Sequence, residues 1–178
     1  MRGLGPARYL FVRTDNVVPA LKRFGGAGFV AAVALTAVAL VRNPEALAQV
    51  SWRVFGLKFL LYGMWALLQD ALVLSFSLVR LEGALRPRFG PNAGWLACAG
   101  ISLVFGATHA PNIPVLLISA PAGFVIARLF LTTTNLAAAA LCHATLGTVL
   151  HQIVRLPCAA AHSILGATST RAMRFSPG

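Results

Sequence analysis

Three ionisable side chains stand inside long apolar stretches of this sequence: Asp70, His109 and His143, with the uncharged Gln69 directly before the acid. Charged groups are costly at membrane depth, so they tend to face the interior of a helix bundle, pair with one another and mark functional paths. A carboxylate can polarise water or hold a metal together with two histidines. Histidines can instead donate hydrogen bonds to a developing oxyanion. Either arrangement suits hydrolysis of an amide bond in a wet cavity within the bilayer.

Two plainer interpretations of the same residues stay open. Each histidine could donate to a nearby carbonyl and only tie helices together, or Asp70 and the histidines could relay protons in a small transporter or helper subunit. Local spacing adds that Phe105 and His109 share a helix face, being four residues apart. His143, Gly147 and His151 form a similar stripe. Close helix packing is the favoured explanation for the glycine.

The composition predicts an integral membrane protein. The 178 residues are 58% hydrophobic and 11% charged, with a mean hydropathy of +0.78, whereas soluble domains carry about 25% charged residues. The formal charge is +11, but the basic residues flank apolar runs, as they do beside membrane helices. We therefore expect membrane lipid as a partner and no nucleic acid.

The elements that must position the polar residues are apolar runs, and they predict an all-α fold, a polytopic transmembrane bundle of about five helices. No segment alternates at period two, so strands are not expected. Asn112 and Asn135 are placed to cap helices. The five runs are residues 25–41, 54–80, 92–108, 113–131 and 135–154.

The predicted organisation is a basic lead-in over residues 1–24, a transmembrane domain over 25–157 and a tail over 158–178. A basic lead followed by an apolar run also resembles a secretory signal peptide, although the run is long for one. Lys and Arg residues favour a cytoplasmic N-terminus by nine to six across the five runs. We expect the protein in the bacterial inner (plasma) membrane.

Three segments resemble, in order and spacing, the motifs of the CAAX-protease and bacteriocin-processing family of intramembrane endopeptidases. FGATHAPN (105–112) is similar to the second motif, Phe-x-x-x-His. NLAAAALCHATLGTVLH (135–151) is similar to the third, His-x-x-x-Asn, and LLQDALVLSFSLVRLE (67–82) stands in the place of the first, Glu-Glu-x-x-x-Arg. The resemblance covers roughly residues 60–157.

The resemblance implies a catalytic set of Gln69, Asp70, His109 and His143. Gln69 stands where the family's water-activating Glu would be, and Asp70 stands at the second Glu. Both motif histidines match directly, as metal ligands or oxyanion donors. A ligand set of Asp70, His109 and His143 would suit zinc or another divalent metal, which would make the protein a metalloendopeptidase.

The sequence departs from the family pattern at several of these positions. The Gln69 amide cannot act as a base, and Asp70 is shorter and turned by about 100° around the helix. Leu74 replaces the Arg that would keep a carboxylate ionised, and Gly147 replaces a polar residue. The resemblance therefore implies hydrolysis of a membrane-associated peptide or protein with reduced or no activity. The alternatives are a catalytically dead peptide-binding member and the small transporter or helper subunit above.

Overall fold

The computed structural model describes residues 15–154, and the described chain is helical without a strand. This confirms the predicted all-α membrane fold. The elements are α2 (Val17–Arg42), α3 (Trp52–Asp70), a π-helix (Ala71–Leu78), α4 (Val79–Phe89), a 3-10 turn (Gly90–Asn92), α5 (Ala93–Ala107), α6 (Ile113–Thr133), α7 (Leu136–Val149) and a second π-helix (Leu150–Val154).

Four helices within residues 15–154 are long and apolar enough to cross a membrane: Val17–Arg42, Trp52–Ala107, Ile113–Thr133 and Leu136–Val154. The second is a succession of helices over 56 residues, which folds back at the 3-10 turn between α4 and α5. The predicted count of five is therefore not confirmed. Helix α2 begins earlier than expected, inside the predicted lead-in. The predicted tail, 158–178, lies outside the described residues.

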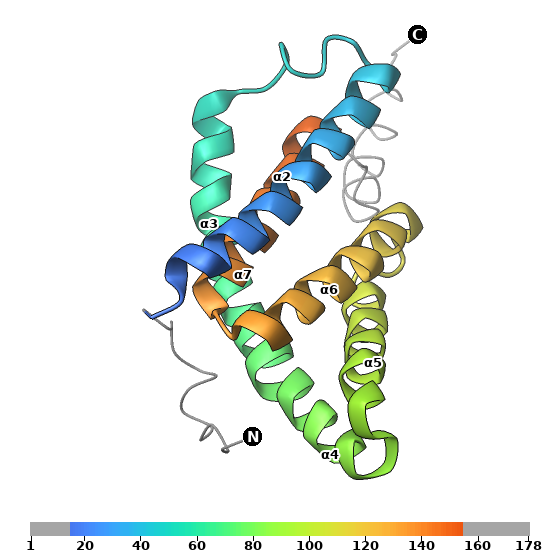
Figure 1. The fold of residues 1–178 in the computed structure, drawn as a ribbon. Helices are drawn as coiled ribbons and strands as arrows, with labels where there is room; N and C mark the ends of the chain where they lie inside the picture. Colours follow the sequence, from blue (N-terminus) through green and yellow to red (C-terminus); the bar gives the residue numbers. More distant parts are fainter. Residues whose placement is uncertain (1–14, 155–178) are drawn as a thin grey trace, which may run out of the picture.

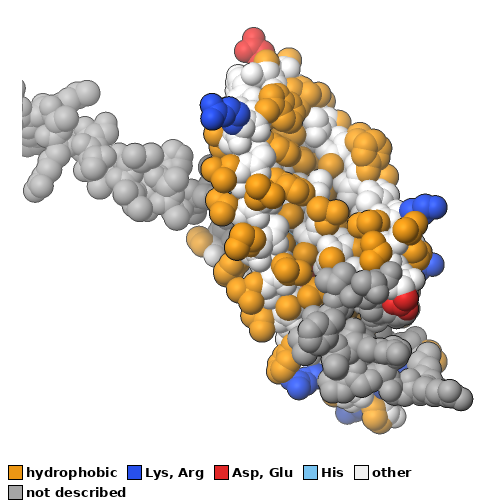
Figure 2. All heavy atoms as spheres, turned by 90° about the vertical axis from the view of Figure 1, so that its left-hand side faces the viewer, with side chains coloured by type: hydrophobic (Ala, Val, Ile, Leu, Met, Phe, Trp, Pro, Cys, Tyr) orange, Lys and Arg blue, Asp and Glu red, His pale blue; other side chains and the backbone are white. Residues whose placement is uncertain are grey.

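The outer face of the bundle is apolar. Val30, Met64 and Leu103 are 68%, 73% and 68% exposed. Figure 2 shows orange apolar side chains over most of one face, with the few charged side chains near its edges. So much exposed apolar surface marks a region that another apolar medium covers, and here that medium is lipid.

Helix α7 runs through the molecule between two neighbours. It lies beside α2 and parallel to it, as Figure 1 shows, with Gly28 so close to Cys142 that a Cβ there would lie 3.1 Å from the Sγ atom. Helix α3 packs on α7 through Ala66, Ala140 and Ala144. Small side chains let helix backbones approach closely, so this packing fixes the distance between α3 and α7.

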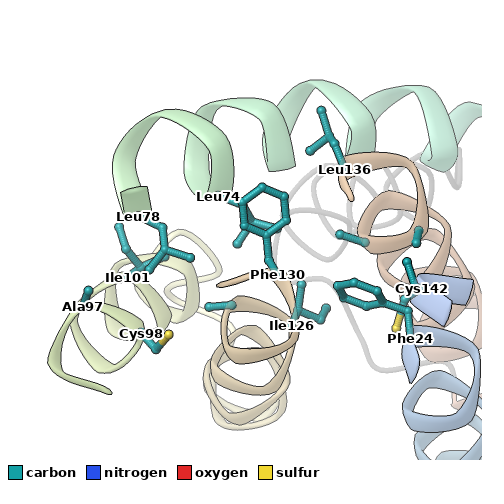
Figure 3. Close-up of a cluster of buried hydrophobic side chains, with 14 residues drawn as sticks. Phe24, Leu74, Leu78, Ala97, Cys98, Ile101, Ile126, Phe130, Leu136 and Cys142 are labelled. Carbon is teal, nitrogen blue, oxygen red and sulfur yellow. The ribbon is translucent and has the colours of Figure 1, made fainter. Parts of the chain in front are cut away.

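The largest buried cluster joins α2, the first π-helix, α5, α6 and α7. It includes Phe24 from α2, Leu74 and Leu78 from the π-helix, Ile101 from α5 and Phe130 from α6, and Figure 3 shows these side chains pointing toward one another. Phe24, Leu78 and Phe130 are fully buried. The cluster holds α5 and α6 against the rest of the bundle.

Asparagine side chains close the end of the bundle where α2 begins. Asn135 accepts a hydrogen bond from the Ala138 N–H at 3.0 Å, and its amide donates to the Asn16 side chain at 3.0 Å. The Asn16 amide donates in turn to the Thr133 carbonyl. At the opposite end of α6, Asn112 caps the helix by accepting a hydrogen bond from the Val115 N–H. The predicted caps at Asn112 and Asn135 are therefore confirmed.

We predict that Asn135→Ala lowers the free energy of unfolding by about 1–3 kcal/mol, because it removes a helix cap and leaves the Ala138 N–H and the Asn16 Oδ1 without this partner. Thermal unfolding in detergent measures the change. Asn43→Ala is the control, since Asn43 is exposed at the end of α2. Equal effects of the two substitutions would contradict the proposed role of Asn135.

Candidate functional site

Asp70 and His143 form a hydrogen-bonded pair between α3 and α7. Asp70 is the last residue of α3 and is 3% exposed. His143 Nδ1 lies 3.1 Å from Asp70 Oδ1. The carboxylate oxygen accepts, so the imidazole donates from Nδ1 and a neutral ring keeps its lone pair on Nε2. The close α3–α7 packing therefore places the acid against one of the two predicted histidines.

His109 lies in the turn that follows α5, and it contacts the Phe105 ring rather than the Asp70–His143 pair. Its Nδ1 lies 3.0 Å from the Phe105 carbonyl oxygen, which can only accept, so Nδ1 donates. The Phe105 ring meets His109 and His143 edge-on, with centroids 5.2 Å and 5.3 Å apart. The three predicted ionisable residues thus gather around Phe105, and Asp70 bonds only one histidine.

A small cavity lies beside the acid. Its volume is about 10 Å³, and it is lined by Asp70, His143 and six residues that carry no polar side chain. Asp70 Oδ2 is buried without a hydrogen-bond partner. A cavity of this size holds about one water molecule, provided that polar groups bind it. The unpaired carboxylate oxygen and the imidazole are such groups.

A larger groove of about 660 Å³ adjoins this cavity. Helices α2, α6 and α7 supply most of its wall, and apolar residues dominate the lining. The small cavity and the groove share Phe105, Ile126 and His143. The polar or ionisable side chains in the groove are those of Tyr62, His109, Ser119, Cys142, His143 and His151.

The π-helix begins immediately after Asp70. Such segments interrupt the α-helical ladder and are frequent at functional sites. Within it Leu74 and Ser75 are both buried, and Ser75 Oγ is the other buried side-chain atom without a partner in the described chain. Leu74, at the position where the family's motif has Arg, packs in the central cluster. Periodicity of the sequence gives no sign of this change in helix type.

Two predicted site features differ in the structure. Gln69 is partly buried and lines neither cavity, unlike Asp70 and the two histidines. Within residues 15–154 no three His, Cys, Asp or Glu side chains come together as a metal site. Asp70, His109 and His143 therefore do not form the predicted zinc ligand set: Asp70 pairs with His143, and His109 donates to the Phe105 carbonyl instead. The residues present do not fit a metal, and the metalloendopeptidase prediction has no support.

Tyr62 is a groove residue that the sequence analysis missed. Its ring packs directly over Gly147, where an added Cβ would lie 2.8 Å from Tyr62 Cε1. The same ring lies against His151 at a tilt of 40°, with centroids 5.5 Å apart. Close helix packing thus explains Gly147, as favoured above. The sequence around Tyr62 did not indicate that it lines the groove, because its contacts with Gly147 and His151 join residues distant in sequence.

Fold and site together define an integral membrane protein with a buried acid–histidine pair beside an apolar groove. The chain matches the family model described as Type II CAAX prenyl endopeptidase Rce1-like over residues 8–149. This match covers most of the chain, so the protein belongs to that family of CAAX-type intramembrane protease-like membrane proteins. No curated protein and no solved structure matches the chain.

We predict that Gly147→Ala destabilises the protein by about 1–3 kcal/mol, because the new methyl group forces the Tyr62 ring to shift. Gly26→Ala is the matched control, since Gly26 also lines the groove and an added Cβ there meets nothing within 4 Å. Alanine at that helical position should be neutral or stabilising. Thermal unfolding of both variants in detergent checks this, and equal stability of the two would contradict the packing described.

Proposed function

We propose that the protein hydrolyses a peptide bond of a membrane-associated substrate slowly, with Asp70 as the base. The supporting observation is the divided role of the carboxylate: one oxygen is fixed by His143, and the other is unpaired beside a water-sized cavity. A base must lie within hydrogen-bond reach of the proton that it removes. Asp70 lines the cavity, and we assign its unpaired Oδ2 as the atom that would bind a water there.

The proposed reaction moves one proton twice. Asp70 Oδ2 takes a proton from the water, and the oxygen attacks the carbonyl carbon of a peptide bond bound in the groove. When the tetrahedral intermediate collapses, the C–N bond breaks and Asp70 returns the proton to the leaving amine. His143 positions the carboxylate through its Nδ1–H. Phe105, Ile126 and His143 line both the small cavity and the groove, so the water and the bound peptide would meet beside these residues.

The same geometry accounts for slow turnover. With both Nδ1–H groups engaged by Asp70 and Phe105, the neutral imidazoles present acceptors at Nε2. An oxyanion needs donors, and losing one donor costs about 10²–10³ in rate. In these tautomers His109 and His143 supply none. His109 is instead suited to accept a hydrogen bond from a substrate N–H.

A catalytically dead peptide-binding protein is the second candidate. It is favoured by the position of Gln69 outside both cavities and by the separation of His109 from the acid. In this case the groove binds a membrane-associated peptide and releases it unchanged.

We also propose that the end of the bundle where α2 begins faces the cytoplasm. Within the described residues that end carries Arg23, Arg80, Arg86, Arg88 and Lys22. Basic residues beside membrane helices favour the cytoplasmic side.

We predict that Asp70→Asn lowers kcat/KM by on the order of 10²–10⁴, because an amide cannot remove a proton from water. The assay uses purified protein in proteoliposomes with a fluorogenic prenylated peptide. Glu82→Gln is the matched control, since Glu82 pairs with the exposed Arg86 on α4, away from the site, and it should leave kcat/KM unchanged.

The outcomes separate the two candidates. Full activity of Asp70→Asn would overturn the catalytic assignment. A wild-type protein that binds the peptide, measured by fluorescence anisotropy, but never cleaves it would favour the second candidate. Absence of both binding and cleavage would contradict both.

A further inference from the structure

The acidic residues of this chain are too few to neutralise the basic surface of α4. The whole sequence has 15 Lys and Arg against 4 Asp and Glu, and all four acids lie within the described residues. Asp70 is committed to His143, Glu82 pairs with Arg86, and Asp15 has an interaction of its own. Glu45 lies in the loop between α2 and α3, at the other end of the bundle.

Arg80 and Arg88 are the arginines of α4 that this shortage leaves without a carboxylate. No ion pair joins either of them to another residue between 15 and 154. Both are exposed and lie eight residues apart on α4. Together with Phe76 and Ala84 they form an exposed row at four-residue spacing, which we call the arginine row.

Two leucines of α4 are committed to packing. Leu81 and Leu85 pack against the central cluster, and Leu81 lies against Gly100 of α5. Helix α4 thus buries these leucines toward α5, while the four side chains of the arginine row are exposed. Such a helix with exposed arginines and aromatics suits the boundary between acyl chains and headgroups.

Aromatic rings hold both guanidinium groups of the row. Arg80 Cζ lies 3.6 Å from the centroid of Phe76, and Arg88 Cζ lies 5.6 Å from that of Phe89. A stacked guanidinium keeps its N–H edge open for bidentate hydrogen bonds to a phosphate. Phe76 and Phe89 are 51% and 40% exposed. An exposed apolar ring therefore lies beside each guanidinium group that could donate hydrogen bonds to a phosphate.

From this we infer that the arginine row binds the headgroup of an anionic phospholipid. The open N–H edges of Arg80 and Arg88 donate hydrogen bonds to the phosphate of this lipid and to the headgroups of neighbouring anionic lipids. Phe76 contacts the acyl chains. A lipid supplies both chemistries in one molecule, whereas a soluble phosphate supplies only the first. The site is independent of the proposed hydrolysis, because it lies on α4 and shares no residue with either cavity.

The test measures binding of fluorescent phosphatidylglycerol and phosphatidylcholine to the purified protein in detergent. Wild type should bind phosphatidylglycerol more tightly, and R80Q/R88Q should weaken that binding by on the order of tenfold to thirtyfold. The control R42Q/R53Q removes the same charge at the other end of the bundle and should retain the preference. Glu82→Gln frees Arg86 beside the row and should tighten binding severalfold.

Several results would overturn the inference. They are equal binding of the two lipids by wild type, an unchanged preference in R80Q/R88Q, and an equal loss in R42Q/R53Q. Displacement of the lipid by glycerophosphate at similar concentration would mean a soluble phosphate site instead. Thermal unfolding of each variant establishes that it is folded, and a variant that unfolds is replaced by the single substitution Arg80→Gln.

Discussion

The hydrogen bond between Asp70 and His143 is the interaction on which the arrangement of the polar residues depends. A carboxylate at 3% exposure is tolerated only with a partner, and the partner comes from a helix more than seventy residues later in the chain. The bond is possible because Ala66, Ala140 and Ala144 let α3 and α7 approach closely. Larger side chains there would separate the acid from the imidazole.

Phe105 connects the Asp70–His143 pair to His109 and to α6. Its ring touches both imidazoles, and its carbonyl oxygen fixes His109. Gly123 of α6 lies so close to the Phe105 ring that an added Cβ would be 2.9 Å from it. The helices α5 and α6 therefore hold Phe105 against the pair, and the ring marks the boundary between the water-sized cavity and the groove.

Features governed by local chemistry could be predicted from the sequence. The caps at Asn112 and Asn135 depend on residues three positions away, and the pairing of an acid with a histidine follows from the cost of burying charge. The distance of His109 from Asp70 could not be predicted, because it depends on the Phe105 ring standing between helices. The apolar runs 54–80 and 92–108 are separate in the sequence, and in the structure the chain folds back between them, where Gly90 has a positive φ and a 3-10 turn joins α4 to α5.

The π-helix after Asp70 has a consequence for how this chain tolerates changes in length. The segment Ala71–Leu78 joins Asp70, anchored on α7, to α4, anchored on α5. Each residue of an α-helix turns the chain by about 100°. The number of residues in the π-helix therefore sets the rotation of α4 relative to Asp70 at the end of α3. Loss of one residue here would leave both anchors intact yet misalign them, whereas loss of one of the exposed residues in the loop 43–51 would leave their alignment unchanged.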